Sequence, residues 1–258
     1  MVFNDNKTPV FFLSPHLDDA VFSAGSIMAS LNTRGFNITV INIFTTPNKT
    51  AKNTISSTAY LRQCKYKNAE QLFADRIRED KETLSTLKNV KIVNLNLTDA
   101  LWRTKGKLNI FEKIISKIIP EFNRIYPTYR WHISKGKISK LDDLLVNSLS
   151  KRLNGLIPSD SVVFFPCGVG GHVDHVITNK VCKNLCAKKI MWLDFPYNLN
   201  CETQNVNPEI VNLEKYEFAE QLQTKSTLIS GYKSQLEPIF GKAGPITKSD
   251  ILYEVKTI

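Results

Sequence analysis

The stretch FFLSPHLDDAVFSAGS, residues 11–26, places one imidazole and two carboxylates between an apolar run and a helix-like pattern. Residues 9–13 predict a buried strand, and residues 20–31 predict the helix that follows it. Polar groups such as His16, Asp18 and Asp19 are costly to bury unless they are paired. Their position at the end of a buried strand therefore indicates a site that compensates them.

A second turn repeats this layout. The apolar run of residues 161–166 leads into CGVGGHVDH, residues 167–175, which carries His172, Asp174 and His175 at the start of another helical pattern. Ligands of parallel α/β sheets bind outside the carboxyl ends of the strands. We therefore expect the two turns to lie at the same edge of one sheet.

Strand and helix patterns alternate along the rest of the chain. Strands are predicted at residues 9–13, 38–46, 90–95, 161–166 and 190–193. Helices are predicted at residues 20–31, 60–73, 76–87, 111–119, 141–153, 174–187 and 214–235. This order predicts an α/β fold: a Rossmann-like, mostly parallel sheet with helices on both faces and a metal site at the C-terminal ends of the strands.

Two details of this prediction concern the middle of the chain. In residues 111–119, the spacing of the isoleucines predicts that Ile114, Ile115, Ile118 and Ile119 face inward. Residues 128–140, TYRWHISKGKISK, break the pattern and are predicted to be a hairpin or flap. We expect this flap to be inserted into a single domain that spans residues 1–258.

Size and composition fit an ordinary globular protein. The 258 residues are 42% apolar, enough for one sizeable core. The net charge is +10, but the basic residues are spread out, which favours a solvated lysine-rich surface over nucleic-acid binding. The five cysteines are odd in number and irregularly spaced, which argues against a disulfide framework. With no signal-like start and no run of about 18 apolar residues, we expect a cytoplasmic protein without an integral membrane segment.

The residue types of the two turns suit a metal. Two histidines and one carboxylate, with remaining positions open, are typical of catalytic zinc sites. The turns hold more polar side chains than such a site needs, so a spare carboxylate and a spare imidazole are acid–base candidates. The residues thus indicate metal-assisted hydrolysis, with a metal-activated water as the nucleophile.

Other interpretations stay open at this point. An Asp-Asp pair at a helix start can simply cap the helix. A non-haem iron enzyme also uses two histidines and one carboxylate, although usually on a β-rich scaffold. A catalytically degenerate sugar- or anion-binding protein of the same fold is the third alternative, and Ala20 is its support in the sequence.

Both turns resemble a known family. SPHLDDAV and GGHVDH resemble the two metal-binding turns of the PIG-L/LmbE family of zinc-dependent N-deacetylases. RIREDKETLSTL, WLDFPYN and KSTLISGYKSQLEPIFG resemble further segments of that family, so the resemblance covers the chain except residues 128–140. It implies one Zn²⁺ per chain and removal of an N-acetyl or other N-acyl group from a small-molecule amino sugar or glycoconjugate. The oligomeric state cannot be read from the sequence.

The resemblance also implies residue roles. Asp18 matches the general base, and His172 matches the group that stabilises the oxyanion or protonates the leaving amine. Asp174 matches a carboxylate that orients an imidazole. The implied zinc ligands are His16, Asp19 and His175.

Substrate contacts are implied more loosely. Arg76 matches a substrate-contacting arginine, and Asp99 is a candidate contact for a sugar hydroxyl. Trp131, in the predicted flap, is expected to cover the site as part of an aromatic lid, and Tyr197 is expected to contact the substrate.

The chain departs from the family pattern at four positions. Leu17 and Val173 replace prolines, and Ala20 replaces a glutamate; none of these matches a ligand or the base. Gly170 stands where some members carry a tyrosine near the oxyanion. The candidates for that missing role are Tyr197, Tyr129 and Trp102.

Overall fold

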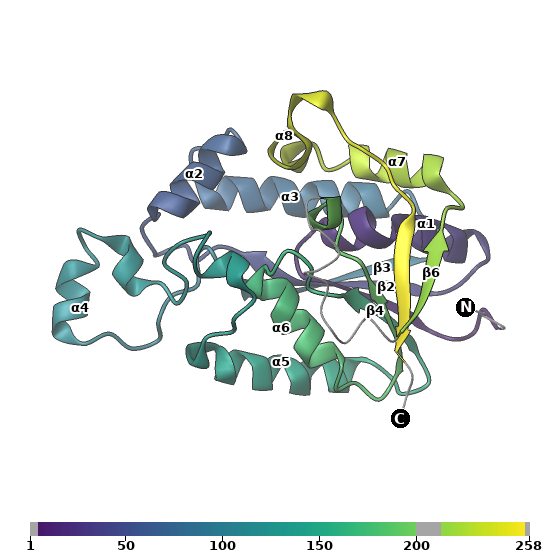
Figure 1. Ribbon diagram of the computed structural model, residues 1–258, viewed down its shortest axis with the longest axis horizontal. Helices are drawn as coiled ribbons and strands as arrows, with labels where there is room; N and C mark the ends of the chain where they lie inside the picture. Colours follow the sequence, from purple (N-terminus) through teal and green to yellow (C-terminus); the bar gives the residue numbers. More distant parts are fainter. Residues whose placement is uncertain (1–4, 200–212, 256–258) are drawn as a thin grey trace.

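Figure 1 shows the computed structural model, which describes residues 5–199 and 213–255. Its centre is a seven-stranded sheet in the order β3-β2-β1-β4-β5-β7-β6. The strands are β1 (Val10–Ser14), β2 (Ile38–Thr46), β3 (Val90–Thr98), β4 (Val162–Pro166), β5 (Lys188–Trp192), β6 (Glu214–Phe218) and β7 (Asp250–Val255). Strands β1 to β5 pair in parallel, and β7 is antiparallel to both β5 and β6. The predicted mostly parallel sheet is confirmed.

Helices cover both faces of this sheet (Figure 1). Helix α1 (Asp19–Thr33) packs against α7 (Leu222–Ser230) on one face, and α5 (Asp143–Leu156) packs against α6 (Val173–Cys182) on the other. The remaining α-helices are α2 (Ile55–Gln63), α3 (Ala69–Leu84), α4 (Ile110–Ile115) and α8 (Lys233–Phe240). Short 3₁₀ helices lie at Pro120–Asn123, Ile133–Lys135, Lys140–Asp142, Tyr197–Leu199 and Gly241–Ala243.

The central strands are apolar because both of their faces are covered. All five residues of β1 are buried, and so are all five of β4. The rings of Phe12 and Phe164 stack across these two strands with centroids 4.6 Å apart. A second apolar core lies on the opposite face and includes Phe11, Leu13 and Phe165. The two cores fix the ends of β1 and β4 side by side, where both polar turns begin.

Several helix boundaries differ from the predictions. The pattern of residues 60–73 is not one helix, because α2 ends at Gln63 and α3 starts at Ala69 with Asn68 as its N-cap. Residues 214–235 begin as strand β6 before α7, and α6 ends at Cys182 instead of residue 187. In these cases the helix-like spacing of apolar residues in the sequence continues through a turn or an edge strand, so it predicted a helix that is too long.

The prediction for residues 111–119 is wrong in length and in orientation. Helix α4 ends at Ile115, and Ile114 and Ile118 are 58% and 82% exposed; Ile119 is exposed too. Only Ile115 is half-buried. The physical reason is that this segment extends away from the sheet (Figure 1), so no core is available for these side chains.

Residues 128–140 do not form a hairpin. They form turns around the 3₁₀ helix Ile133–Lys135, with Ile133 fully buried. The amide of Gly136 donates to the Gly171 carbonyl at 2.7 Å, which ties this segment to the second polar turn.

Within the described residues, no helix has both the length and the apolar character needed to cross a bilayer. Of the cysteines, Cys64, Cys167 and Cys182 are free and buried, and Cys186 is free and exposed.

Candidate active site

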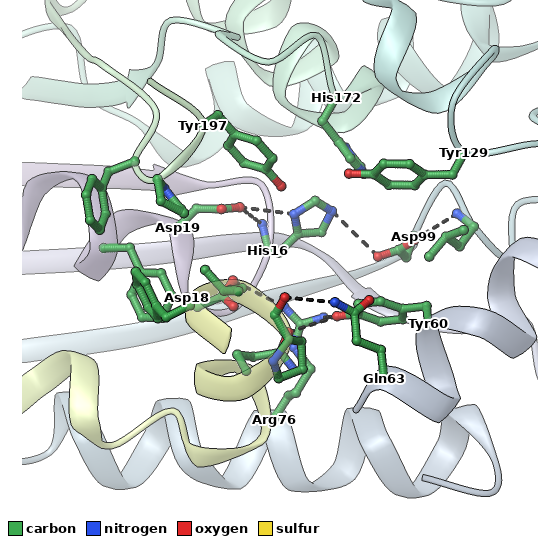
Figure 2. A pocket seen from close by; sticks show the side chains of 18 of the residues that line it. His16, Asp18, Asp19, Tyr60, Gln63, Arg76, Asp99, Tyr129, His172 and Tyr197 are labelled. Atoms are coloured by element: carbon green, nitrogen blue, oxygen red, sulfur yellow. Dashed lines mark hydrogen bonds and ion pairs between the residues drawn. The ribbon is translucent and has the colours of Figure 1, made fainter. Parts of the chain in front are cut away.

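The strand order decides where a ligand can bind. From β1 the chain adds β2 and β3 on one side of the sheet, then returns to add β4 on the other side. The turns after β1 and β4 therefore flank a topological switch point, where open α/β sheets form their binding crevice. A pocket of about 730 Å³ lies at this place, and Figure 2 shows the side chains that line it.

Two imidazoles, one from each polar turn, converge on one carboxylate oxygen of Asp19. Asp19 Oδ2 lies 3.0 Å from His16 Nδ1 and 3.2 Å from His175 Nε2. The backbone amide of His16 donates to the same oxygen at 2.8 Å, which fixes the turn. Burial raises the pKa of Asp19, but the two imidazoles outweigh this effect and hold the pKa well below its usual value.

Each of the two imidazoles meets a second buried carboxylate through its other nitrogen. His16 Nε2 lies 3.3 Å from Asp174 Oδ2, and His175 Nδ1 lies 2.7 Å from Asp194 Oδ1. Burial lowers the pKa of His16, yet the carboxylates of Asp174, Asp19 and Asp99 raise it to about 9. Carboxylates in this position orient metal-binding histidines and fix their tautomers.

The donor set fits a metal ion. His175 Nε2 is buried and, despite its approach to Asp19, has no hydrogen-bond partner among the described residues. His16, His172 and His175 offer nitrogens within 4.8 Å of one another, and His16, Asp99 and Asp174 form a second such group. Buried nitrogen and carboxylate donors at this spacing suit zinc.

Asp18 does not cap helix α1. It occupies the N-cap position, but its side chain makes no capping hydrogen bond. Instead, Arg76 Nη2 donates to Asp18 Oδ1 at 3.2 Å, and both side chains are buried. Burial raises the pKa of Asp18, and the Arg76 guanidinium opposes part of that rise. The helix-cap explanation of the Asp-Asp pair is therefore wrong for the Asp18 side chain.

His172 is set up as a neutral hydrogen-bond donor. Its Nδ1 accepts from the backbone amide of Asp174 at 3.3 Å, so a neutral ring carries its proton on Nε2. Burial, and then the nearby charge of His16, lower the pKa of His172 well below its ordinary value. This side chain lines the pocket.

Two residues that support the site were not predicted from the sequence. Asp194, which positions His175, lies just beyond the end of β5 within the WLDFPYN segment. Arg103 ion-pairs with Asp174 Oδ1 at 2.5 Å and with Asp142 Oδ2 at 2.7 Å. A carboxylate at the end of a predicted parallel strand was a usable signal for Asp194. Arg103 lies in a loop segment, and no comparable signal marks it.

Comparison with known proteins agrees with this geometry. The family model described as PIG-L, GlcNAc-PI de-N-acetylase, matches residues 11–186, which contain both polar turns. The chain belongs to the PIG-L family. It is accordingly a hydrolase of amide carbon–nitrogen bonds. A search of the curated proteins finds no match.

Solved structures share the PIG-L fold at low sequence identity. The zinc-inhibited form of teicoplanin deacetylase has a TM-score of 0.71 at 17% identity, covering 95% of this chain and 97% of that one. The deacetylase of the antimicrobial A40926 pseudoaglycone has a TM-score of 0.67 at 18% identity, covering 97% of each chain. A conserved protein from Thermus thermophilus has a TM-score of 0.53 at 13% identity, with 97% of each chain covered. These likenesses establish the fold.

Most residues predicted from the sequence to contact the substrate lie around the pocket, but one does not. Arg76, Asp99 and Tyr197 line it. Trp131 is 68% exposed and is not part of the lining that the described residues form, so the structure does not bring it to the site. Tyr129, from the same segment, lines the pocket instead.

Of the three candidates for the missing tyrosine, two face the site in this PIG-L chain. Tyr197 and Tyr129 line the pocket from two sides (Figure 2). Trp102 is buried behind it, where its Nε1 donates to Asn53 Oδ1 at 3.1 Å. Burial raises the pKa of Tyr197 well above its usual value, so its hydroxyl keeps the proton.

Part of the pocket lining is apolar. It is contributed mainly by the segment around Tyr197 and by α8 with the residues after it. The apolar lining residues there are Phe22, Phe195, Pro196, Leu199, Pro238, Ile239, Phe240 and Ile246. A ligand that fills the pocket thus meets buried charged groups on one part of the wall and hydrocarbon on another.

Proposed function

We propose that this chain is a zinc-dependent N-deacetylase that removes an N-acetyl or other N-acyl group from an amino-sugar glycoconjugate. The observation that carries the proposal is the convergence of His16 and His175 on Asp19, with Asp18 beside it in the same pocket. Membership of the PIG-L family supports the reaction class.

One zinc ion per chain would be held by His16, Asp19 and His175. When bound, it would polarise the amide carbonyl and lower the pKa of a coordinated water toward about 7. Asp174 and Asp194, through the second nitrogens of the two imidazoles, keep the ligand rings in position.

Asp18 acts as the general base. Its carboxylate lines the pocket, and burial brings its pKa closer to neutrality, which makes it a better proton acceptor at neutral pH. The ion pair with Arg76 holds the Asp18 carboxylate in one orientation while the proton is transferred. Removing the water proton lets the oxygen attack the amide carbon.

Two donors stabilise the oxygen that becomes negative during this attack. His172 presents Nε2–H from one side, and Tyr197 presents a protonated hydroxyl from another. Both side chains are held in place by the fold, so little reorganisation is needed in the transition state. As the carbon–nitrogen bond breaks, Asp18 passes the proton that it took from the water to the departing amine, while His172 keeps its Nε2–H on the oxyanion.

The substrate is proposed to be amphipathic. Asp99 at the floor accepts hydrogen bonds from sugar hydroxyls, and the apolar walls contact a hydrophobic group attached to the sugar. Two structural neighbours, teicoplanin deacetylase and a pseudoaglycone deacetylase, support a glycoconjugate over a free sugar as the substrate.

Metal analysis and product assay together test the proposal. Protein purified without chelators is expected to contain about one zinc per chain and to release acetate or a longer acid from N-acylated aryl or alkyl glucosaminides. Iron at the site would favour the non-haem iron alternative. Zinc without acid release, but with tight glycoside binding, would favour a degenerate binding protein.

A further inference from the structure

A protruding segment, residues 105–122 and here called the α4 arm, exposes an unusual amount of hydrocarbon. Six large apolar side chains of this arm are exposed within thirteen consecutive positions: Ile110, Phe111, Ile114, Ile118, Ile119 and Phe122. Scattered exposed apolar residues are normal, but a contiguous group marks an interaction surface.

The arm is attached to the rim of the pocket. The Glu121 carboxylate accepts a hydrogen bond from the backbone amide of Ile55 at 2.8 Å, and Ile55 lines the pocket while being 82% exposed. Lys52 Nζ donates to the Lys117 carbonyl at 2.9 Å, a second tie between the arm and the approach to α2. In Figure 1 the arm, marked by α4, projects from the same end of the molecule at which α2 lies.

The charge of the arm is positive where it faces solvent. Lys107, Lys113 and Lys117 are exposed and form no ion pair with any residue in the described ranges. Its two acidic residues are both engaged: Glu112 pairs with Lys105 at 3.1 Å, and Glu121 binds the Ile55 amide. Apolar side chains interleaved with unpaired lysines are characteristic of segments that lie in a membrane interface.

We propose that the α4 arm docks this enzyme on an anionic lipid bilayer, with its isoleucines and phenylalanines in the interface and its lysines against the headgroups. A second copy of this chain fits less well, because two arms would bring like charges together and the net charge is +10. The binding is peripheral, and it places the pocket mouth next to the lipid surface. Anionic lipid is typical of the cytoplasmic leaflet, where the sequence predicts this protein to reside.

Vesicle co-sedimentation tests the docking directly and needs no substrate. The whole protein is mixed with phosphatidylcholine vesicles, with or without phosphatidylglycerol, at low and high salt. We expect binding to the anionic vesicles that weakens as salt increases. Absence of binding to anionic vesicles at low salt would overturn the proposal.

Matched variants locate the contact. Ile114→Ser with Ile118→Ser, and separately Lys113→Glu with Lys117→Glu, should each lower the partition coefficient about tenfold or more. Leu144→Ser is the control, because Leu144 is equally exposed but lies on α5, away from the arm. Unchanged thermal melting would show that the variants fold. Equal binding by the arm variants and the control would contradict the assignment. Concentration-dependent dimers, abolished by the Ile114/Ile118 variant, together with no vesicle binding, would instead assign the arm to self-association.

Discussion

The side chain of Tyr197 occupies the space that a side chain at position 170 would need: a Cβ added to Gly170 would lie 2.8 Å from Tyr197 Cβ. Gly170 also has φ +84°, a backbone conformation that favours glycine. A side chain at position 170 and Tyr197 in its present position therefore exclude each other. Tyr197 reaches the site from a different loop and lies in the space beside Gly170.

Gly170→Ala should displace Tyr197 and lower kcat/KM for amide hydrolysis by about tenfold or more, since a misplaced donor loses its alignment with the developing charge. The measurement is steady-state kinetics on an N-acylated glucosaminide. Gly155→Ala is the control, because a Cβ there has nothing within 4 Å. Equal kinetics in both variants would mean that Tyr197 does not contribute.

Tyr197→Phe keeps the ring and removes only the hydroxyl. The loss of one oxyanion donor is expected to lower kcat by about 10- to 1,000-fold with a smaller change in KM. The free energy of unfolding should be unchanged, because the ring still fills the same space beside Gly170. A variant whose KM rises while kcat is unchanged would identify Tyr197 as a substrate contact only.

Asp18→Asn and His175→Ala separate the base from the ligands. Asp18→Asn should retain zinc and lose turnover by about 100-fold or more, because the amide cannot accept the water proton. His175→Ala should lose the metal. Elemental analysis beside activity distinguishes them; a folded Asp18→Asn protein without metal would show that the base and ligand assignments are wrong.

Asp194→Asn should weaken zinc affinity by about 10- to 100-fold, because the His175 ring loses its charged partner on Nδ1. Competition against a chelator of known affinity measures this change. Asp160→Asn, at an exposed position, is the control. An unaltered affinity in Asp194→Asn would remove Asp194 from the metal site.

Lys225→Met probes a buried ion pair on the face of α1. Lys225 Nζ lies 2.7 Å from Asp250 Oδ1, and both side chains are fully buried. Burial raises the pKa of Asp250 to about 6, against the lowering effect of Lys225. The pKa of Asp250 is thus higher in the folded than in the unfolded protein. The free energy of unfolding therefore falls as pH rises through about 6, because Asp250 ionises in the folded protein.

Without Lys225 the pKa of Asp250 rises further. The variant therefore loses most stability at pH values at which Asp250 is ionised in the protein with Lys225. We expect a loss of about 3–5 kcal/mol in the free energy of unfolding at pH 8, and a smaller loss at pH 5. Urea titrations at both pH values measure it, with the exposed Lys151→Met as control. A loss that is independent of pH would point to packing alone.

Sequence reasoning succeeded where a single local signal dominates. Residues 38–46 are β-branched or apolar at every position except Asn42, and strand β2 has the predicted bounds. The two polar turns could be placed at one sheet edge because parallel strands share their carboxyl ends, and His16 and His175 do meet there. Periodicity failed for Ile114 and Ile118, since an apolar stripe shows which side chains share a face but not whether a partner covers that face.

The parts of the site that were missed depend on long-range contacts. Arg103 reaches Asp174 across 71 positions of sequence, and Asp194 reaches His175 on α6 from the segment after β5. Trp131 and Tyr129 are equally plausible aromatic contacts in the sequence, and only the anchoring of Ile133 and Gly136 decides that Tyr129 faces the pocket.

The place of β7 in the sheet has a consequence for biosynthesis. This strand is made after β6, yet it lies between β5 and β6 and pairs with both. Until residues 250–255 have left the ribosome, one edge of β5 is unpaired and β6 has no strand to pair with. Lys225 also lacks its partner Asp250 during this time. The sheet therefore closes only after translation of this region, and in the unfinished chain the edge of β5 is open to pairing with other chains.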